Sequence, residues 1–272
     1  MKLTLEKDGQ RYSFQTEKGI DLSISLNPNG PRAWYVEPMR IEPVRTEQFL
    51  GSVAEGGAVN FRDVYFNPHG HGTHTENVGH IVDTDFPVVK SLDSSHFMAN
   101  LVTVELRQGV AQGLTEGATQ DLPQDLSQNL ETQVSEPDWV VSEESLLGID
   151  LNCEALIIRT KPNDHSKTQR QYSGTNFPYL TLGAMQRIVD AGVQHLLIDL
   201  PSVDREEDAG ALAAHHLFWN VPAEPNFQKT ITELIYVPNE IADGTYVLNL
   251  QVSNFANDAA PSRPMLFDLV EE

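Results

Sequence analysis

Apolar and polar residues alternate over several short stretches of the chain, which is the spacing expected of half-buried β-strands. The first stretch is typical of a hairpin, with Leu3 and Leu5 before a turn at residues 8–9 and with Tyr12 and Phe14 after it. Further strands are predicted, in chain order, at residues 20–26, 58–66, 100–106, 154–160, 193–200, 245–252 and 264–270.

Two stretches have helical spacing instead. Thr181 can cap the first helix and Gly192 can end it, and the apolar positions between them are Leu182, Met185, Ile188 and Val189. The second helix is predicted over residues 205–220, because three acidic residues at 206–208 suit a helix N-terminus. There is no internal repeat and no domain boundary, so residues 1–272 are predicted to form a single α/β domain with a mixed, strand-rich sheet and packed helices.

Composition narrows the possible partners. The net charge of -21 over 272 residues argues against nucleic acid and anionic membrane surfaces, which select basic patches. The single cysteine, Cys153, excludes an internal disulfide and is expected to be a small core residue. No apolar run is long enough to span a membrane and the N-terminus does not resemble a signal peptide, so we expect a soluble protein of a reducing, cytoplasmic compartment.

Residues 108–137 are rich in Gln, Asp, Ser and Gly and have weak apolar periodicity. This composition favours an acidic surface insertion. A lid or an oligomer contact is the alternative.

The residue types that can bind a metal gather in residues 67–81, whose sequence is NPHGHGTHTENVGHI. One carboxylate, Glu76, lies among four of the nine histidines: His69, His71, His74 and His80. Imidazole nitrogens and carboxylate oxygens are ligands of Zn²⁺ and Mn²⁺, and in an extended chain His74 and Glu76 project to the same face. A polar loop whose histidines cap neighbouring backbone is the alternative, but convergent His and Glu side chains favour a metal site.

The segment HGHGTHTENVGH resembles the HxGTHxDxPxH motif of the cyclase family of metal-dependent hydrolases, which includes bacterial kynurenine formamidases and isatin hydrolases. Gly72, Thr73, His74 and His80 fall in register with the motif. Glu76 replaces its aspartate, and Val78 replaces its proline.

The first histidine of the motif falls on Gly70, between His69 and His71. A bulge at Gly70 or Gly72 would correct the side-chain direction by one residue. We therefore predict that one of the two histidines, and not both, binds the metal. His69 is favoured because Pro68 stiffens its approach, whereas His71 lies between two glycines.

The resemblance implies further site residues. It places a metal-binding histidine of the second helix at His215 and a metal-binding glutamate of the following strand at Glu233. His80 would carry a proton, as the imidazole pKa of about 6.5 allows. The aromatic residues Trp34 and Tyr35 belong either to the core or to the wall of a substrate pocket.

The function predicted from these residues and this resemblance is hydrolysis of a small-molecule amide by metal-activated water. The bond would be a formamide or the amide of a cyclic imide or lactam. The cofactor would be one or two Zn or Mn ions per chain, and the chain would form a homo-oligomer, a dimer or a tetramer. The alternative is a catalytically impaired relative that binds a small ligand.

Overall fold

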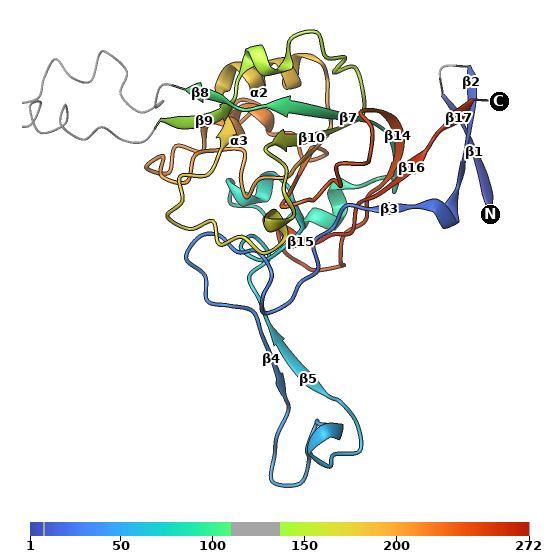
Figure 1. Cartoon of the computed structure of the whole chain (residues 1–272). Coiled ribbons are helices and arrows are strands. Elements are labelled where there is room, and N and C mark those ends of the chain that lie inside the picture. Colours follow the sequence, from blue (N-terminus) through green and yellow to red (C-terminus); the bar gives the residue numbers. More distant parts are fainter. Residues whose placement is uncertain (8, 110–136, 272) are drawn as a thin grey trace, which may run out of the picture.

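Nine strands form the central sheet of the protein, for which a computed structural model describes residues 1–7, 9–109 and 137–271 (Figure 1). Most of the predicted acidic insertion, at residues 110–136, lies outside the described residues. In spatial order the strands are β15 (Ala259–Pro261), β6 (His74–Glu76), β13 (Thr230–Glu233), β12 (His195–Ile198), β10 (Ala155–Lys161), β7 (His96–Glu105), β14 (Gly244–Asn249), β16 (Met265–Asp268) and β3 (Ile20–Asp21).

The sheet is mixed, as predicted. Its four middle strands, from β13 to β7, are parallel to one another. The strands on either side, β6 and β15 at one edge and β14, β16 and β3 at the other, run antiparallel to their neighbours. Strand β13 therefore has a parallel neighbour on one side and an antiparallel neighbour on the other.

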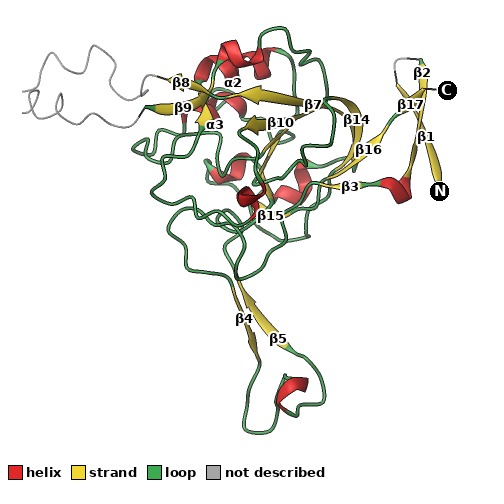
Figure 2. Ribbon diagram, in the orientation of Figure 1, coloured by secondary structure: helices red, strands yellow, loops and turns green. Residues whose placement is uncertain are grey.

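Helices are few and lie outside the sheet (Figure 2). The described α-helices are α2 (Leu182–Asp190) and α3 (Ala213–Phe218). The described 3-10 helices are Thr16–Lys18, Val53–Glu55, Val78–His80, Val88–Ser91, Glu143–Leu146 and His165–Thr168. Among the described helices, none has the length and apolarity that a membrane crossing requires.

Three small sheets complete the described structure. They consist of β1 (Lys2–Lys7), β2 (Gln10–Gln15) and β17 (Val270–Glu271); β8 (Arg107–Gly109), β9 (Asp138–Val141) and β11 (Tyr179–Leu180); and β4 (Arg40–Pro43) and β5 (Arg62–Tyr65). The β4–β5 hairpin projects away from the rest of the molecule, and the two termini lie close together beside β1 and β17 (Figure 1).

The core lies on both faces of the sheet, because successive side chains of a strand point to opposite faces. On β10, Leu156 and Ile158 pack towards α2 and α3, where Met185 and Phe218 meet them. Residues of the opposite parity pack against the other face, including Ala155, Ile157, Leu101 and Leu248. These strands are buried on both faces, which explains their continuous apolar runs.

Most predicted elements are confirmed. The N-terminal hairpin pairs Leu3 with Phe14 and Leu5 with Tyr12. Helix α2 begins after Thr181, whose side chain accepts a hydrogen bond from the Ala184 N–H. The strands predicted at residues 100–106, 154–160, 193–200, 245–252 and 264–270 correspond to β7, β10, β12, β14 and β16.

Several predicted strands are shorter than expected. The strand predicted at residues 20–26 ends at Asp21, whose carboxylate accepts hydrogen bonds from the backbone N–H and the hydroxyl of Ser23. Such local bonds compete with a sheet ladder. The strand predicted at residues 58–66 is confined to β5. Its partner is β4, which ends at Pro43 and for which no strand was predicted.

The second predicted helix is wrong at its start. Its residues 205–212 are not helical, and α3 begins only at Ala213. Ala209, Gly210 and Leu212 have φ values of 58°, 78° and 42°, which a right-handed helix cannot contain. The acidic residue Asp208 instead accepts hydrogen bonds from the N–H groups of Gly210 and Leu212 and so closes a turn.

Candidate metal centre

The pairing of β6 with β13 brings three of the predicted side chains to one face of the sheet. His74 is directly opposite Glu233, and Glu76 follows His74 by two residues. Side chains of opposite residues, and of residues two apart, share a face. His74, Glu76 and Glu233 are 0 %, 1 % and 3 % exposed, so the site has two carboxylates inside the protein.

His69 reaches the same place from the turn before β6. Its Nδ1 lies 2.9 Å from Glu76 Oε2. The side chain of Asn67 closes the turn by accepting hydrogen bonds from the N–H groups of His69 and Gly70. Gly72 then takes a φ of 60°, a left-handed conformation that favours glycine, and this redirects the chain into β6.

The structure places His71 elsewhere. Its Nδ1 accepts a hydrogen bond from the Asn67 N–H, and its Nε2 lies 2.9 Å from the carbonyl oxygen of Glu37. Both ring nitrogens therefore contact the backbone, in the manner of a loop-capping histidine. Of the two histidines that flank Gly70, the structure brings His69 to Glu76, and His71 holds the loop.

His80 lies at the end of the 3-10 helix Val78–His80, which Asn77 caps by accepting a hydrogen bond from the Gly79 N–H. Its Nδ1 is 3.9 Å from Glu76 Oε2. The His80 side chain is 29 % exposed, whereas those of His74 and His215 are 0 % and 3 % exposed. Among these three histidines, His80 is therefore the one open to small molecules.

His215 enters from α3, and its Nε2 lies 3.1 Å from Glu76 Oε1. Its Nδ1 lies 2.6 Å from Asp204 Oδ2. Asp204 also accepts hydrogen bonds from the Ala214 and His215 N–H groups. The same carboxylate therefore satisfies N–H groups at the start of α3 and orients the His215 ring. Asp204 was not predicted as a site residue, although it follows the strand predicted at residues 193–200 by only four residues.

Burial and the neighbouring charges shift the pKa values in this cluster. Burial opposes the charged form of His215, but the contacts with Asp204 and Glu76 outweigh it and raise the pKa of His215 to about 10. The pKa of His69 is also raised to about 10, where Asp258 and Glu76 outweigh burial. Burial and the nearby charge of Glu76 raise the pKa of Glu233. These shifts show that the buried carboxylates favour positive charge beside them.

Two buried polar atoms of the cluster lack hydrogen-bond partners among the described residues, which is consistent with a metal site. Within the described part of the chain, His74 Nε2 and Glu233 Oε1 have no hydrogen-bond partner. His74 Nε2 is 3.3 Å from Glu233 Oε2 without the geometry of a hydrogen bond. Leaving buried polar atoms unpaired costs about 1–3 kcal/mol each, so such atoms call for an explanation. Imidazole nitrogen beside carboxylate oxygen is the donor set of a transition metal, and it fits one here.

Three groups of side chains in the described residues have ligand atoms close enough to bind one ion. Within each group these atoms lie within 4.8 Å of one another. The groups are His69, His74 and Glu76; Glu76, His80 and His215; and His69, His80 and Asp258. Glu76 belongs to two of these groups, and its two oxygens lie near different histidines, Oε2 near His69 and Oε1 near His215.

A cavity of about 280 Å³ opens onto this cluster. Trp34 and Leu212 supply an apolar part of its wall. Five residues of the cluster form another part: His69, Glu76, His80, His215 and Glu233. Ser202 and Asn67 add polar groups, and the lining includes no lysine or arginine. Tyr35 is 68 % exposed and does not line this cavity, so the structure brings only one of the two predicted aromatic residues to the site.

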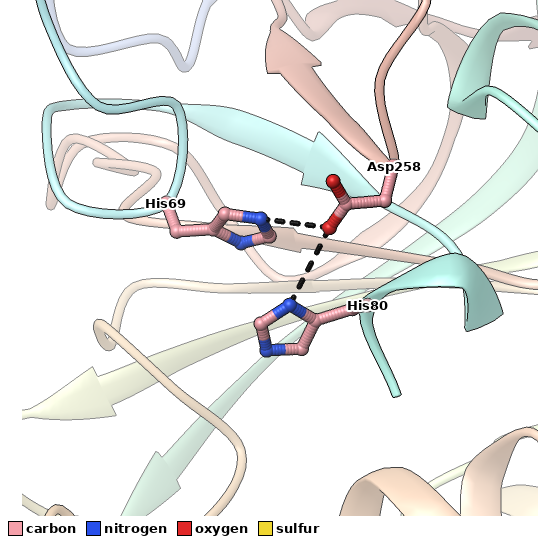
Figure 3. Close-up of side chains that lie close together, drawn as sticks. All are labelled: His69, His80 and Asp258. Carbon is pink, nitrogen blue, oxygen red and sulfur yellow. Dashed lines mark hydrogen bonds and ion pairs between the residues drawn. The ribbon is translucent and has the colours of Figure 1, made fainter. Parts of the chain in front are cut away.

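Asp258 is the second acidic residue that the sequence analysis missed. It lies just before β15, and the pairing of Ala259 with Glu76 brings it beside the cluster. Its Oδ2 is 2.8 Å from His69 Nε2 and 3.5 Å from His80 Nδ1 (Figure 3). Nothing in the local sequence marks it, because its position depends on the register of β15 and β6.

The sequence matches the model of a known family. The model of the family described as "Putative cyclase" matches residues 20–205, which is more than half of the chain. The chain therefore belongs to the cyclase family, which confirms the resemblance of the histidine motif. A comparison with curated protein sequences found no match.

Solved structures share the fold at low sequence identity. A predicted metal-dependent hydrolase from Bacillus stearothermophilus has a TM-score of 0.58 at 14% identity, over 92% of this chain and 98% of that one. Isatin hydrolase A from Ralstonia solanacearum has a TM-score of 0.58 at 15% identity, over 93% of this chain and 92% of that one. An isatin hydrolase bound to the product analogue thioisatinate has a TM-score of 0.55 at 12% identity, over 94% and 93%. These likenesses support the single-domain α/β fold.

Proposed function

We propose that this protein is a metal-dependent hydrolase of a small-molecule amide, either a formamide or the amide of a cyclic imide or lactam. One observation carries the proposal: two buried carboxylates, Glu76 and Glu233, lie in a cavity whose other ionisable groups are histidines. Two buried carboxylates without lysine or arginine favour a divalent cation as the countercharge. The structural likeness to hydrolases of this family supports the choice of reaction.

The residues present would hold one or two ions, Zn²⁺ or Mn²⁺. His69, His74 and Glu76 would hold the first, and His215 and Glu233 would help Glu76 to hold a second. A divalent ion in such a site lowers the pKa of a coordinated water and polarises a carbonyl.

The remaining residues would bind the substrate and move protons. His80 is proposed as the proton carrier because it lines the cavity and its side chain is 29 % exposed. Trp34 would contact the apolar part of the substrate, and its own ring is held edge-on against Phe177 at 5.6 Å. A cavity of about 280 Å³ suits a substrate with one or two rings.

The metal content of protein purified without chelator or added metal tests the proposal. We expect about one or two transition ions per chain and hydrolysis of an aryl formamide or of isatin. A matched pair of variants on α3 provides the control: His215→Ala should lower the metal content, and His216→Ala should leave it unchanged. Metal-free protein that binds these compounds without hydrolysing them would instead support the catalytically impaired relative.

We also propose that the chain forms a homo-oligomer. The projecting β4–β5 hairpin exposes several large apolar side chains, among them Ile41, Phe61 and Val64. A two-stranded hairpin is marginally stable alone in water, and exposed apolar patches are typical of protein contacts. Light scattering coupled to gel filtration should give a mass of two or four chains, and Ile41→Lys with Val64→Lys should shift it towards one chain.

A further inference from the structure

Asp258 contacts two histidines to which the proposed function gives different roles. Its Oδ2 is 2.8 Å from His69 Nε2, on the side of that ring away from Glu76. The same oxygen is 3.5 Å from His80 Nδ1 (Figure 3). A proposed metal ligand and the proposed proton carrier thus share one carboxylate.

The sheet fixes where this carboxylate lies. Ala259 pairs with Glu76 across β15 and β6, and the Asn77 N–H donates a hydrogen bond to the Asp258 carbonyl oxygen at 3.1 Å. The Asp258 side chain is 24 % exposed, and that of His69 is 20 % exposed. Asp258 therefore approaches His69 from the residue before a separate strand, and the pairing of β15 with β6 fixes its backbone.

Two histidines, one on each side of Glu76, are each held between Glu76 and a second carboxylate. His215 directs Nε2 to Glu76 and Nδ1 to Asp204, and His69 directs Nδ1 to Glu76 and Nε2 to Asp258. A histidine that binds a metal generally donates its other ring N–H to a carboxylate or carbonyl, which fixes the tautomer and the ring orientation.

We propose that Asp258 is a positioning residue of the metal centre. It accepts the Nε2–H of His69, which leaves Nδ1 free to bind the ion beside Glu76, and it holds the ring of His80 against that of His69, whose centroids are 4.3 Å apart. This inference rests on the proposed function. It assigns Asp258 a role through the two histidines and not as a ligand.

Cobalt binding tests this role without any substrate. The metal-free wild type and its variants would be titrated with Co²⁺ against a competing chelator, and the visible absorption of the bound ion would be recorded. We expect Asp258→Ala to weaken Co²⁺ binding about 10- to 100-fold and to change the absorption spectrum. Asp258→Asn should weaken it less, because the amide oxygen can still accept the Nε2–H of His69. Asp85→Asn, at an exposed carboxylate, is the matched control and should bind as the wild type does.

The outcomes separate the two proposals. Wild-type affinity and spectrum in both Asp258 variants would overturn the positioning role alone. An equal loss in Asp258→Asn and Asp258→Ala would also overturn it, since a direct ligand behaves in that way. A wild type that does not bind Co²⁺ would overturn the proposed function together with this inference. If circular dichroism shows that Asp258→Ala is unfolded, the comparison of Asp258→Asn with Asp85→Asn decides.

Discussion

Buried histidines lie near the two ends of strands β12 and β13 and have opposite chemical surroundings. At the start of both strands, His195 Nδ1 lies 2.9 Å from the Thr230 hydroxyl, and its ring packs on Phe97 at 4.2 Å. Burial there lowers the pKa of His195 to about 4. Beyond the other end, His215 lies between two carboxylates, which outweigh burial and raise its pKa to about 10.

Burial alone therefore does not turn a histidine into a metal ligand. His195 has a hydroxyl partner and an aromatic neighbour, so a neutral ring satisfies it. At the other end of the strands several carboxylates lie among the histidines, and His74 Nε2 and Glu233 Oε1 remain without hydrogen bonds within the described residues. Buried carboxylates beside the rings, together with these two atoms, distinguish a candidate metal centre from a histidine that only fills the core.

The most damaging single change should be His74→Ala. It removes the proposed ligand that faces Glu233 and leaves two buried carboxylates with fewer partners, so we expect metal binding to be lost and turnover with it. Metal analysis of the purified variant measures the first effect, and hydrolysis of an aryl formamide measures the second. His195→Ala, at the other end of the strands, should retain the metal; loss of the metal in both variants would show that folding, and not ligation, is responsible.

His80→Ala should separate turnover from binding. The variant should keep its metal, while turnover falls about 10²- to 10⁴-fold because general acid–base catalysis is lost. Metal stoichiometry and hydrolysis rates, measured on the same preparation, distinguish the two effects. If His80→Ala lost the metal as fully as His74→Ala, His80 would be a ligand and another group would have to carry the proton.

The acid stability of the protein should depend on His195. Because its pKa is lowered from 6.5 to about 4 in the folded state, the unfolded chain binds the proton first as the pH falls. The contribution of His195 to the free energy of unfolding is therefore complete above pH 6.5, the unfolded pKa. It falls progressively towards pH 4, by up to about 3 kcal/mol. Urea unfolding of metal-free protein between pH 7 and 4 should show a smaller loss for His195→Gln than for the wild type. If the free energy of unfolding fell equally with pH in both proteins, the His195 ring would not be neutral in the folded state.

The sequence predicts elements that depend on neighbouring residues. The N-terminal hairpin, helix α2 and the apolar middle strands follow from periodicity and capping, and they are confirmed. Residues 67–81 also contain most of the candidate ligands. One turn and one short strand are enough to bring them together in space. Such local features can be predicted without knowing how the strands pair.

The remaining features depend on pairing between distant residues. Asp258 and Glu76 are far apart in the sequence and meet only because β15 pairs with β6. Asp204 reaches His215 because the backbone at Ala209 and Leu212 turns left-handed and delays the start of α3. Helical periodicity and the acidic residues at 206–208 instead predict that the helix begins at residue 205. The carboxylates of Asp204 and Asp258, which contact the histidines, were therefore not predicted from the sequence, whereas the histidines were.

The smallest expected difference separates the two histidines that flank Gly70. His69 Nδ1 lies 2.9 Å from Glu76 Oε2, whereas both ring nitrogens of His71 contact backbone groups of residues 37 and 67. His69→Ala should weaken metal affinity at least about tenfold, or about 1.4 kcal/mol, because it removes a proposed ligand. His71→Ala should change the affinity by less than about twofold, although it removes a contact that holds the loop, so its melting temperature should fall without a matching loss of metal. Isothermal titration of both metal-free variants with Zn²⁺ compares them directly. Equal and small changes in affinity would show that the ligand position next to Gly70 is not used, and would favour a binding protein over a hydrolase.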